Sequence, residues 1–121
     1  MVLYAEDRSC TTQFELGEMF CRGDARSRDY DQAFNWYARS AKKGYRRAQH
    51  RLGTLYARGQ GVARNYVKAY AWCKVSAYQK SKKALRKLRC IETYMSCEQI
   101  RDGRQLAQHY YNLYVPKGIT R

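Results

Sequence analysis

The sequence lacks several features that would define a specialised class of protein. A single proline and eight glycines in 121 residues exclude a collagen-like or linker-rich chain. No uninterrupted apolar run exceeds five residues, as in 69–73, whereas a membrane-spanning helix needs about 20. Glu6 and Asp7 stand where a secretory signal would carry basic residues and then an apolar core. We therefore expect a cytoplasmic protein.

The five cysteines do not form the pattern of a metal site. Their number is odd, no Cys-x-x-Cys pair exists, and His50 and His109 are isolated in sequence from any cysteine. Structural zinc sites use closely spaced Cys and His ligands. We expect reduced thiols that fill apolar positions on helices, and we expect neither a metal nor another cofactor.

Patterns of catalytic residues are also missing. Neither histidine has a carboxylate at helical spacing, and Glu15 and Glu18 share a helix face without any sign of a buried acid pair. There is no Gly-x-Ser-x-Gly sequence and no phosphate-binding loop. We predict that the protein is not an enzyme.

A shift of 36 residues reveals an internal repeat. Segments 13–41 and 49–77 are 29 residues long and share 11 identities, where chance gives about two. The identical pairs are Gln13/Gln49, Leu16/Leu52, Gly17/Gly53, Arg22/Arg58, Gly23/Gly59, Arg28/Arg64, Tyr30/Tyr66, Ala33/Ala69, Trp36/Trp72, Ser40/Ser76 and Ala41/Ala77. The chain therefore contains two copies of one structural unit.

Each copy is predicted to form two helices. In the second copy, Leu52, Leu55 and Tyr56 recur at offsets of three and four and make one apolar stripe. Gly59 is suited to stop the first helix, and Asn65 to cap the start of the second. The first copy has equivalent residues at the equivalent places.

A glycine lies inside the first helix of each copy. Gly17 and Gly53 each cost about 1 kcal/mol of helix stability relative to alanine. Their recurrence at matched positions predicts that another helix crosses closely at this point.

The remainder of the chain, from about residue 81, is predicted to form a third and less regular helix pair. The apolar stripe of its first helix consists of Ala84, Leu85, Leu88, Ile91 and Met95. Ser96 with Gln99 makes a capping box that begins the last helix, whose apolar residues include Leu113 and which ends at Pro116. Such a degenerate pair is typical of a cap that shields the end of a helical stack.

The repeated motifs resemble a known family. The second copy carries Leu52-Gly53-x-x-Tyr56-x-x-Gly59-x-Gly61-Val62, then Asn65-Tyr66-x-Lys68-Ala69-x-x-Trp72, then Ser76-Ala77. This pattern resembles the Sel1-like repeat, a relative of the tetratricopeptide repeat. The first copy carries the same pattern but departs from it in the loop, where Ala25 and Arg26 replace the usual Gly-Val.

The resemblance implies an all-α fold in which a right-handed α–α superhelix forms a short solenoid. Its two Sel1-like repeats would span about 13–44 and 49–80, followed by a capping pair at about 81–115, in one domain covering 1–121. It also implies a small adaptor or scaffold for protein complexes. The fold itself carries no chemistry and does not select a partner.

Acidic residues are absent from the middle of the chain. Residues 32–91 hold 16 basic residues and no acid, so the charge of this stretch alone exceeds the net charge of the whole chain, which is +14. Three interpretations stay open: a solvated face that only keeps the protein soluble, a surface that docks an acidic protein, and a surface that binds nucleic acid or anionic lipid. No recognisable nucleic-acid-binding motif is present.

The candidate contact residues follow from the helix-pair arrangement, in which the first helix of each pair would line a concave face. The basic candidates are Arg22, Arg47, Arg51, Arg58, Lys83, Arg86 and Lys87. Arg22 and Arg58 have a second explanation, because a cation at a helix C-terminus offsets the helix dipole. Tyr110, Tyr111 and Tyr114 are further candidates, since Tyr and Arg are common in binding hot spots.

The predicted function is therefore a protein–protein interaction adaptor with an acidic partner. The alternative is a basic module that binds nucleic acid or an anionic membrane surface. A third expectation is a homo-oligomer formed through exposed solenoid ends, because an open solenoid leaves apolar end faces that another copy can cover.

Overall fold

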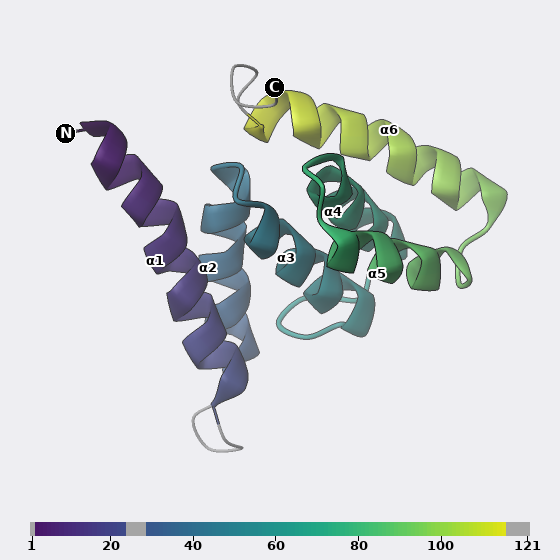
Figure 1. The fold of residues 1–121 in the computed structure, drawn as a ribbon. Coiled ribbons are helices and arrows are strands. Elements are labelled where there is room, and N and C mark those ends of the chain that lie inside the picture. Colours follow the sequence, from purple (N-terminus) through teal and green to yellow (C-terminus); the bar gives the residue numbers. More distant parts are fainter. Residues whose placement is uncertain (1, 24–28, 116–121) are drawn as a thin grey trace.

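The computed structural model of the chain describes residues 2–23 and 29–115, with side chains from Cys10 onward (Figure 1). The helices found there are α1 (Val2–Arg22), α2 (Tyr30–Lys42), α3 (Arg46–Arg58), α4 (Tyr66–Tyr78), α5 (Lys82–Glu92) and α6 (Cys97–Tyr114). These ranges contain no strand, and the predicted all-α fold is confirmed. The predicted loop at 24–28 and the helix stop at Pro116 lie outside the described residues.

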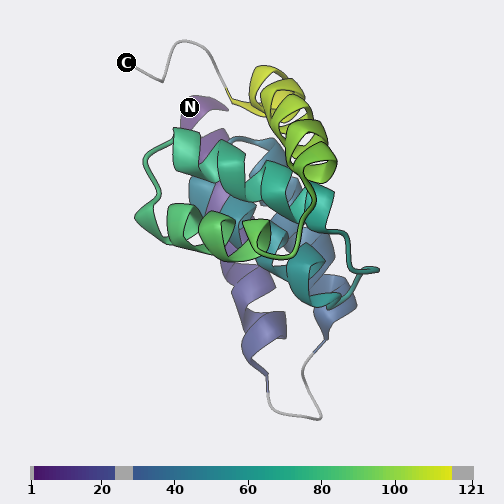
Figure 2. The ribbon, with the colours of Figure 1, turned by 90° about the vertical axis from the view of Figure 1, so that its right-hand side faces the viewer.

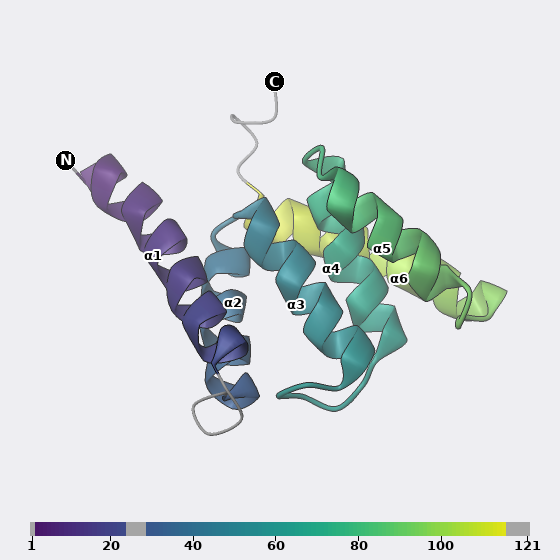
Figure 3. The same ribbon diagram turned by 60° about the horizontal axis from the view of Figure 1, so that its bottom comes forward.

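The helices form a short α-solenoid. Consecutive helices pack on each other from α1 to α5. Figure 3 shows α1, α3 and α5 side by side in one row, with α2 and α4 behind them. None of the described helices is long and apolar enough to cross a bilayer. The row of first helices is the face on which the sequence places most of its basic candidates.

The 36-residue period recurs in individual hydrogen bonds. The Ser40 hydroxyl donates to the main-chain oxygen of Cys10 at 2.7 Å, and the Ser76 hydroxyl donates to the main-chain oxygen of Arg46 at 2.7 Å. The donors Ser40 and Ser76 are 36 residues apart, and so are the acceptors Cys10 and Arg46. The same hydrogen bond therefore joins α1 to α2 and α3 to α4.

Local capping signals explain where the second helix of each repeat begins. The Asp29 side chain accepts a hydrogen bond from the Gln32 amide at 3.1 Å, and the Asn65 side chain accepts one from the Lys68 amide at 3.0 Å. Each bond satisfies an amide that the first turn of a helix leaves unpaired. Gly59 adopts a φ of 70°, the left-handed conformation that ends α3. These predicted helix boundaries are confirmed.

The glycines inside α1 and α3 mark close helix crossings, as predicted. A Cβ on Gly53 would lie 2.5 Å from Cys73 Sγ and 3.0 Å from the main-chain oxygen of Ala69. A Cβ on Gly17 would lie 2.6 Å from the ring of Tyr37. Because Tyr37 and Cys73 occupy matched positions, both repeats use glycine to bring their two helices together.

Helix α6 packs across α4 and reaches α2, so the last helix covers the second repeat (Figure 2). Trp72 on α4 is only 3% exposed, and its ring stacks on Tyr110 and Tyr114 with centroids 4.4 and 5.7 Å apart. Ser96 and Gln99 form the predicted capping box at the start of α6. The stacked rings join the capping helix to the core.

Three residues predicted to lie on the buried apolar stripes are instead exposed. Met19, the counterpart of Leu55 in α1, is 68% exposed, Leu85 is 42% exposed and Leu113 is 57% exposed. In α5 the buried stripe is narrow and consists of Ala84, Leu88 and Ile91, so Leu85 lies at its solvent edge. In α6 the buried residues are Gly103 and Ala107, and Leu113 lies off the face that contacts α4. The predicted apolar stripes were too wide.

Candidate functional site

The row formed by α1, α3 and α5 carries a series of adjoining pockets, which we call the groove. At one end, a pocket of about 490 Å³ is bounded by Phe14 and Met19 of α1 and by Tyr45 before α3. At the other end, a shallow depression of about 430 Å³ that is widely open to solvent is bounded by His50 of α3 and Lys83 of α5. A smaller pocket between them shares Phe14 with the first and both His50 and Lys83 with the second. The groove therefore runs across all three helices.

The basic residues predicted as contacts are brought together in the groove. Arg22, Arg51 and Arg58 line one pocket of about 240 Å³ beside α1, Arg47 lies in the middle, and Lys83, Arg86 and Lys87 line the α5 end. These seven side chains come from three helices that are far apart in sequence. Their convergence gives this face a dense positive charge.

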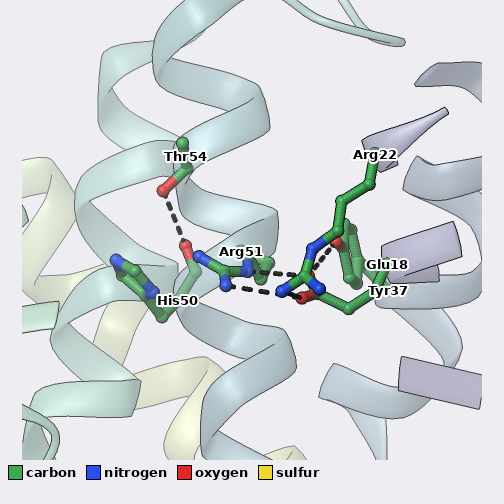
Figure 4. A network of polar contacts seen from close by, with 6 residues as sticks. All are labelled: Glu18, Arg22, Tyr37, His50, Arg51 and Thr54. Carbon is green, nitrogen blue, oxygen red and sulfur yellow. Dashed lines mark hydrogen bonds and ion pairs between the residues drawn. The ribbon is translucent and has the colours of Figure 1, made fainter. Parts of the chain in front are cut away.

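Two acidic side chains, Glu15 and Glu18, lie at the α1 end of this basic surface, and Glu18 is held by several neighbours. Glu18 accepts hydrogen bonds from the Tyr37 hydroxyl and from Arg51 Nε at 2.8 Å (Figure 4). Arg22 Nη2 lies 2.7 Å from its second carboxylate oxygen. Glu18 therefore forms an ion pair with each of Arg22 and Arg51. Glu18 therefore links α1 to both α2 and α3.

The surroundings of Glu18 keep its carboxylate charged. Partial burial raises the pKa of Glu18, but hydrogen bonds from Tyr37 and Arg51, with the nearby charges of Arg51 and Arg22, outweigh this effect and lower the pKa overall. Burial, followed by the contact with Glu18, raises the pKa of Tyr37. At neutral pH the carboxylate is ionised, and it neutralises part of the positive charge of Arg51.

His50 lies in the groove between α3 and α5 and is half-buried. Desolvation lowers its pKa to about 4, and the positive charges of Arg51, Lys87 and Lys83 add to this shift. The imidazole is therefore neutral at pH 7. The lining of the α5 end consists of this neutral ring, three cations and Cys90, without a carboxylate among these described residues.

Comparison with known proteins identifies the helix pairs. The sequence profile of the Sel1 repeat matches residues 12–45 and 46–81. The chain belongs to the Sel1 repeat family. Sel1 repeats are in general modules for protein–protein interaction, and proteins of this kind are typically non-enzymatic scaffolds.

Two solved structures resemble this Sel1 repeat protein. One is a protective antigen present in uropathogenic Escherichia coli strains that displays an SLR fold, with 29% identity and a TM-score of 0.84 over 89% of this chain and 23% of that chain. The other is a Sel1 repeat protein from Oxalobacter formigenes, with 23% identity and a TM-score of 0.66 over 86% of this chain and 45% of that chain. This chain thus spans less than half of either protein. A search of curated proteins gives no match.

Two arginines at the start of α3 have different surroundings. Arg46 Nη1 donates to the main-chain oxygen of Gln79 at 2.8 Å, at the end of α4. Arg46 therefore helps to join the two helices of the second Sel1 repeat. The guanidinium of Arg47 lies 4.8 Å from the ring centroid of Phe14, which places its charge above the centre of the groove.

The three candidate tyrosines of α6 lie away from the groove and contact α4. Tyr110 and Tyr114 stack on Trp72, and the Tyr111 ring meets the Tyr78 ring edge-to-face with centroids 5.5 Å apart. All three are half-buried. Much of their ring surface therefore serves packing within the chain, and they do not contribute to the basic surface.

The chemistry available in the groove is that of charge and hydrogen bonding. Among the side chains described, those of residues 10–23 and 29–115, no three His, Cys, Asp or Glu gather as a metal site requires. The sequence did not predict the Glu18 network; it indicated only that Glu15 and Glu18 share a helix face, with no sign of a buried acid pair. The residue matched to Glu18 in the second Sel1 repeat is Thr54, so the repeat pattern contains no signal for the network.

Proposed function

We propose that this Sel1 repeat protein is a small non-enzymatic adaptor that binds an acidic segment of another protein in the groove. The observation that carries the proposal is the convergence of seven basic side chains on one face. Of these seven, only Arg22 and Arg51 pair with a carboxylate among the described residues, and that carboxylate is Glu18. A partner's carboxylates would offset the remaining repulsion. The proposal places the protein in the cytoplasm, a reducing compartment, which fits the free thiols of Cys21, Cys73, Cys90 and Cys97.

A specific feature favours a protein partner over a nucleic acid. Glu18 and Glu15 both line the α1 end of the groove, and the low pKa of Glu18 keeps it ionised. Because these carboxylates offset the charges of Arg22 and Arg47 at the same end, a continuous chain of phosphates that crossed the groove would gain little there. A peptide can place its acidic residues selectively against the α5 end.

The test is a fluorescence anisotropy titration with a short Asp- and Glu-rich peptide. The variant Lys83→Glu/Arg86→Glu/Lys87→Glu should weaken binding by about 30-fold or more, because three favourable contacts become repulsive. The matched control is Lys42→Glu/Lys80→Glu/Arg101→Glu, which reverses three exposed cations that line none of the groove's pockets. Both variants have a net charge of 14 − 6 = +8.

The control variant should bind the peptide within about threefold of the wild type. Equal weakening in both variants would mean that only the overall charge matters, and it would refute the groove as the binding site. The same titrations with single-stranded RNA and with anionic lipid vesicles test the alternative function. Tighter binding of either than of the peptide, with a steep dependence on salt, would overturn the proposed partner. Light scattering over a range of protein concentrations tests self-association through the solenoid ends.

A further inference from the structure

The groove differs chemically between its two ends. At the α1 end the carboxylates of Glu15 and Glu18 offset the charges of Arg22 and Arg47, whereas the α5 end contains three cations and no acid among the described lining residues. A ligand of negative charge would therefore be attracted more strongly at the α5 end than at the α1 end. The groove is therefore suited to a ligand whose charge changes along its length.

The α1 end also offers an apolar surface. Phe14 forms the floor at 3% exposure, and its ring meets the Tyr45 ring edge-to-face with centroids 5.3 Å apart. Met19 stands at the wall and is 68% exposed, while Leu55, its counterpart in the second Sel1 repeat, is only 2% exposed. A large apolar side chain of a ligand would remove Met19 and the remaining ring surface from water.

Arg47 separates these two regions. Its guanidinium lies above Phe14, and it lines both the large pocket at α1 and the small pocket that leads to His50 and Lys83. An acidic residue placed next to an apolar anchor would meet Arg47 first and α5 next. Along the groove, an apolar region of balanced charge is thus followed by a basic region.

From this order we infer that the groove recognises its peptide ligand in one register: a large apolar residue enters the pocket formed by Phe14, Met19 and Tyr45, and acidic residues on only one side of it lie against Arg47 and α5. This inference rests on the proposed function and adds the composition and the orientation of the ligand. It favours acidic residues on the α5 side of the anchor, because on the other side Glu15 and Glu18 offset the positive charge of the pocket.

Three peptides with identical composition and different order test the register. They carry one leucine or phenylalanine among Asp, Glu, Gly and Ser residues, placed at the N-terminal end, at the C-terminal end or in the centre. Both end positions are needed because the peptide can run along the groove in either direction. The better of the two end-anchored peptides should bind about tenfold tighter than the centred peptide.

Variants at the apolar pocket provide a second test of the register. Met19→Ser removes the exposed wall of the pocket and should reduce the advantage of the end-anchored peptide to about twofold or less. Leu113→Ser is the matched control, since it removes an exposed apolar side chain from α6, away from the groove, and should leave the advantage unchanged. A benzophenone in place of the apolar residue should crosslink to 11–22 rather than to 82–92.

The possible failures are distinguishable. Equal affinity of the three peptides, or crosslinks on α5, would overturn the register. If the charge reversal at Lys83, Arg86 and Lys87 still weakened the binding of all three peptides, the proposed function would stand without the register. If that reversal changed the binding of none of them, the proposed function would fail as well.

Discussion

The two Sel1 repeats have the same internal contacts but different charges along the groove. Each uses a glycine at its helix crossing and a serine that bonds to the preceding helix. At matched positions on the groove, however, Glu15 and Glu18 of the first repeat correspond to Arg51 and Thr54 of the second. Residues that recur between the repeats build the fold, and residues that differ determine what the groove can bind.

The repeats also differ in how their tryptophans are covered. Trp36 is half-buried, with the Arg39 guanidinium 4.9 Å from its ring centroid, while Trp72 is buried beneath the rings of Tyr110 and Tyr114. The same residue is therefore near the surface in one repeat and inside the core in the other. The difference arises from α6, which contacts α4 far more extensively than it contacts α2.

The largest expected effect comes from truncating the two tryptophans. Trp72→Ala should lower the free energy of unfolding by about 3–5 kcal/mol, because it empties the space between α4 and α6. Trp36→Ala should cost only about 1 kcal/mol, since its ring is partly in water already. Urea denaturation followed by circular dichroism measures both values. Equal losses would contradict the role assigned to α6.

A methyl group at the helix crossing of the second repeat should have the next largest effect. Gly53→Ala should cost about 1–3 kcal/mol of unfolding free energy, despite the better helix propensity of alanine, because its Cβ would meet Cys73 Sγ and the main-chain oxygen of Ala69. Urea denaturation again provides the measurement. Adding Cys73→Ala should make the combined loss smaller than the sum of the two single losses. An additive result would show that Gly53 is not limited by this contact.

The role of the two acidic residues in the first repeat can be tested by substituting Glu18 and Glu15. Glu18→Ala should cost about 2 kcal/mol, because it removes the partner of the buried Tyr37 hydroxyl and of Arg51. Glu15→Ala should change stability by less than about 0.5 kcal/mol, since this side chain is exposed. Thermal or urea unfolding of the two variants distinguishes them. Similar values would mean that the Glu18 network does not stabilise the fold.

The smallest effect concerns pH. The folded state holds the pKa of His50 near 4, below the value of 6.5 for a free histidine, so the unfolded chain takes up a proton first as the pH falls. Stability from this residue is complete above pH 6.5 and declines as the pH falls toward 4. Between pH 6.5 and 5 we expect a loss of about 1 kcal/mol, since solvent screens a partly exposed group.

His50→Gln should flatten that decline, as measured by urea denaturation at a series of pH values. The window above pH 5 separates this effect from Glu18, whose lowered pKa makes its own contribution disappear only at more acidic pH. An identical slope in the variant and the wild type would assign the acid sensitivity to other groups.

Much of the fold could be predicted because its signals are local. Asn65 as a cap and Gly59 as a helix end act within a few residues, and the repeat places their counterparts automatically. The position of α6 could not be predicted, because the stacking of Tyr110 on Trp72 joins residues that no spacing rule relates. Leu85 was assigned wrongly because helical periodicity gives the direction of a stripe and not its width.

The groove was partly predictable for a similar reason. Its basic residues were found because an unopposed run of charge and a repeated helix pair together indicate one face, as for Lys83 and Lys87. The network around Glu18 was not found, because its partners Tyr37 and Arg51 belong to two other helices. Contacts between three helices depend on the tertiary arrangement, which one sequence does not encode in any local pattern.

The hydrogen bonds of the two repeat serines have a consequence for how such proteins gain additional repeats. Ser40 and Ser76 attach to carbonyl groups of Cys10 and Arg46, two residues with nothing in common except their backbone. Since every amino acid has a main-chain oxygen, this hydrogen bond does not depend on which residue accepts it. A duplicated helix pair can therefore form the same bond in its new position, while the residues on its outer surface are free to change.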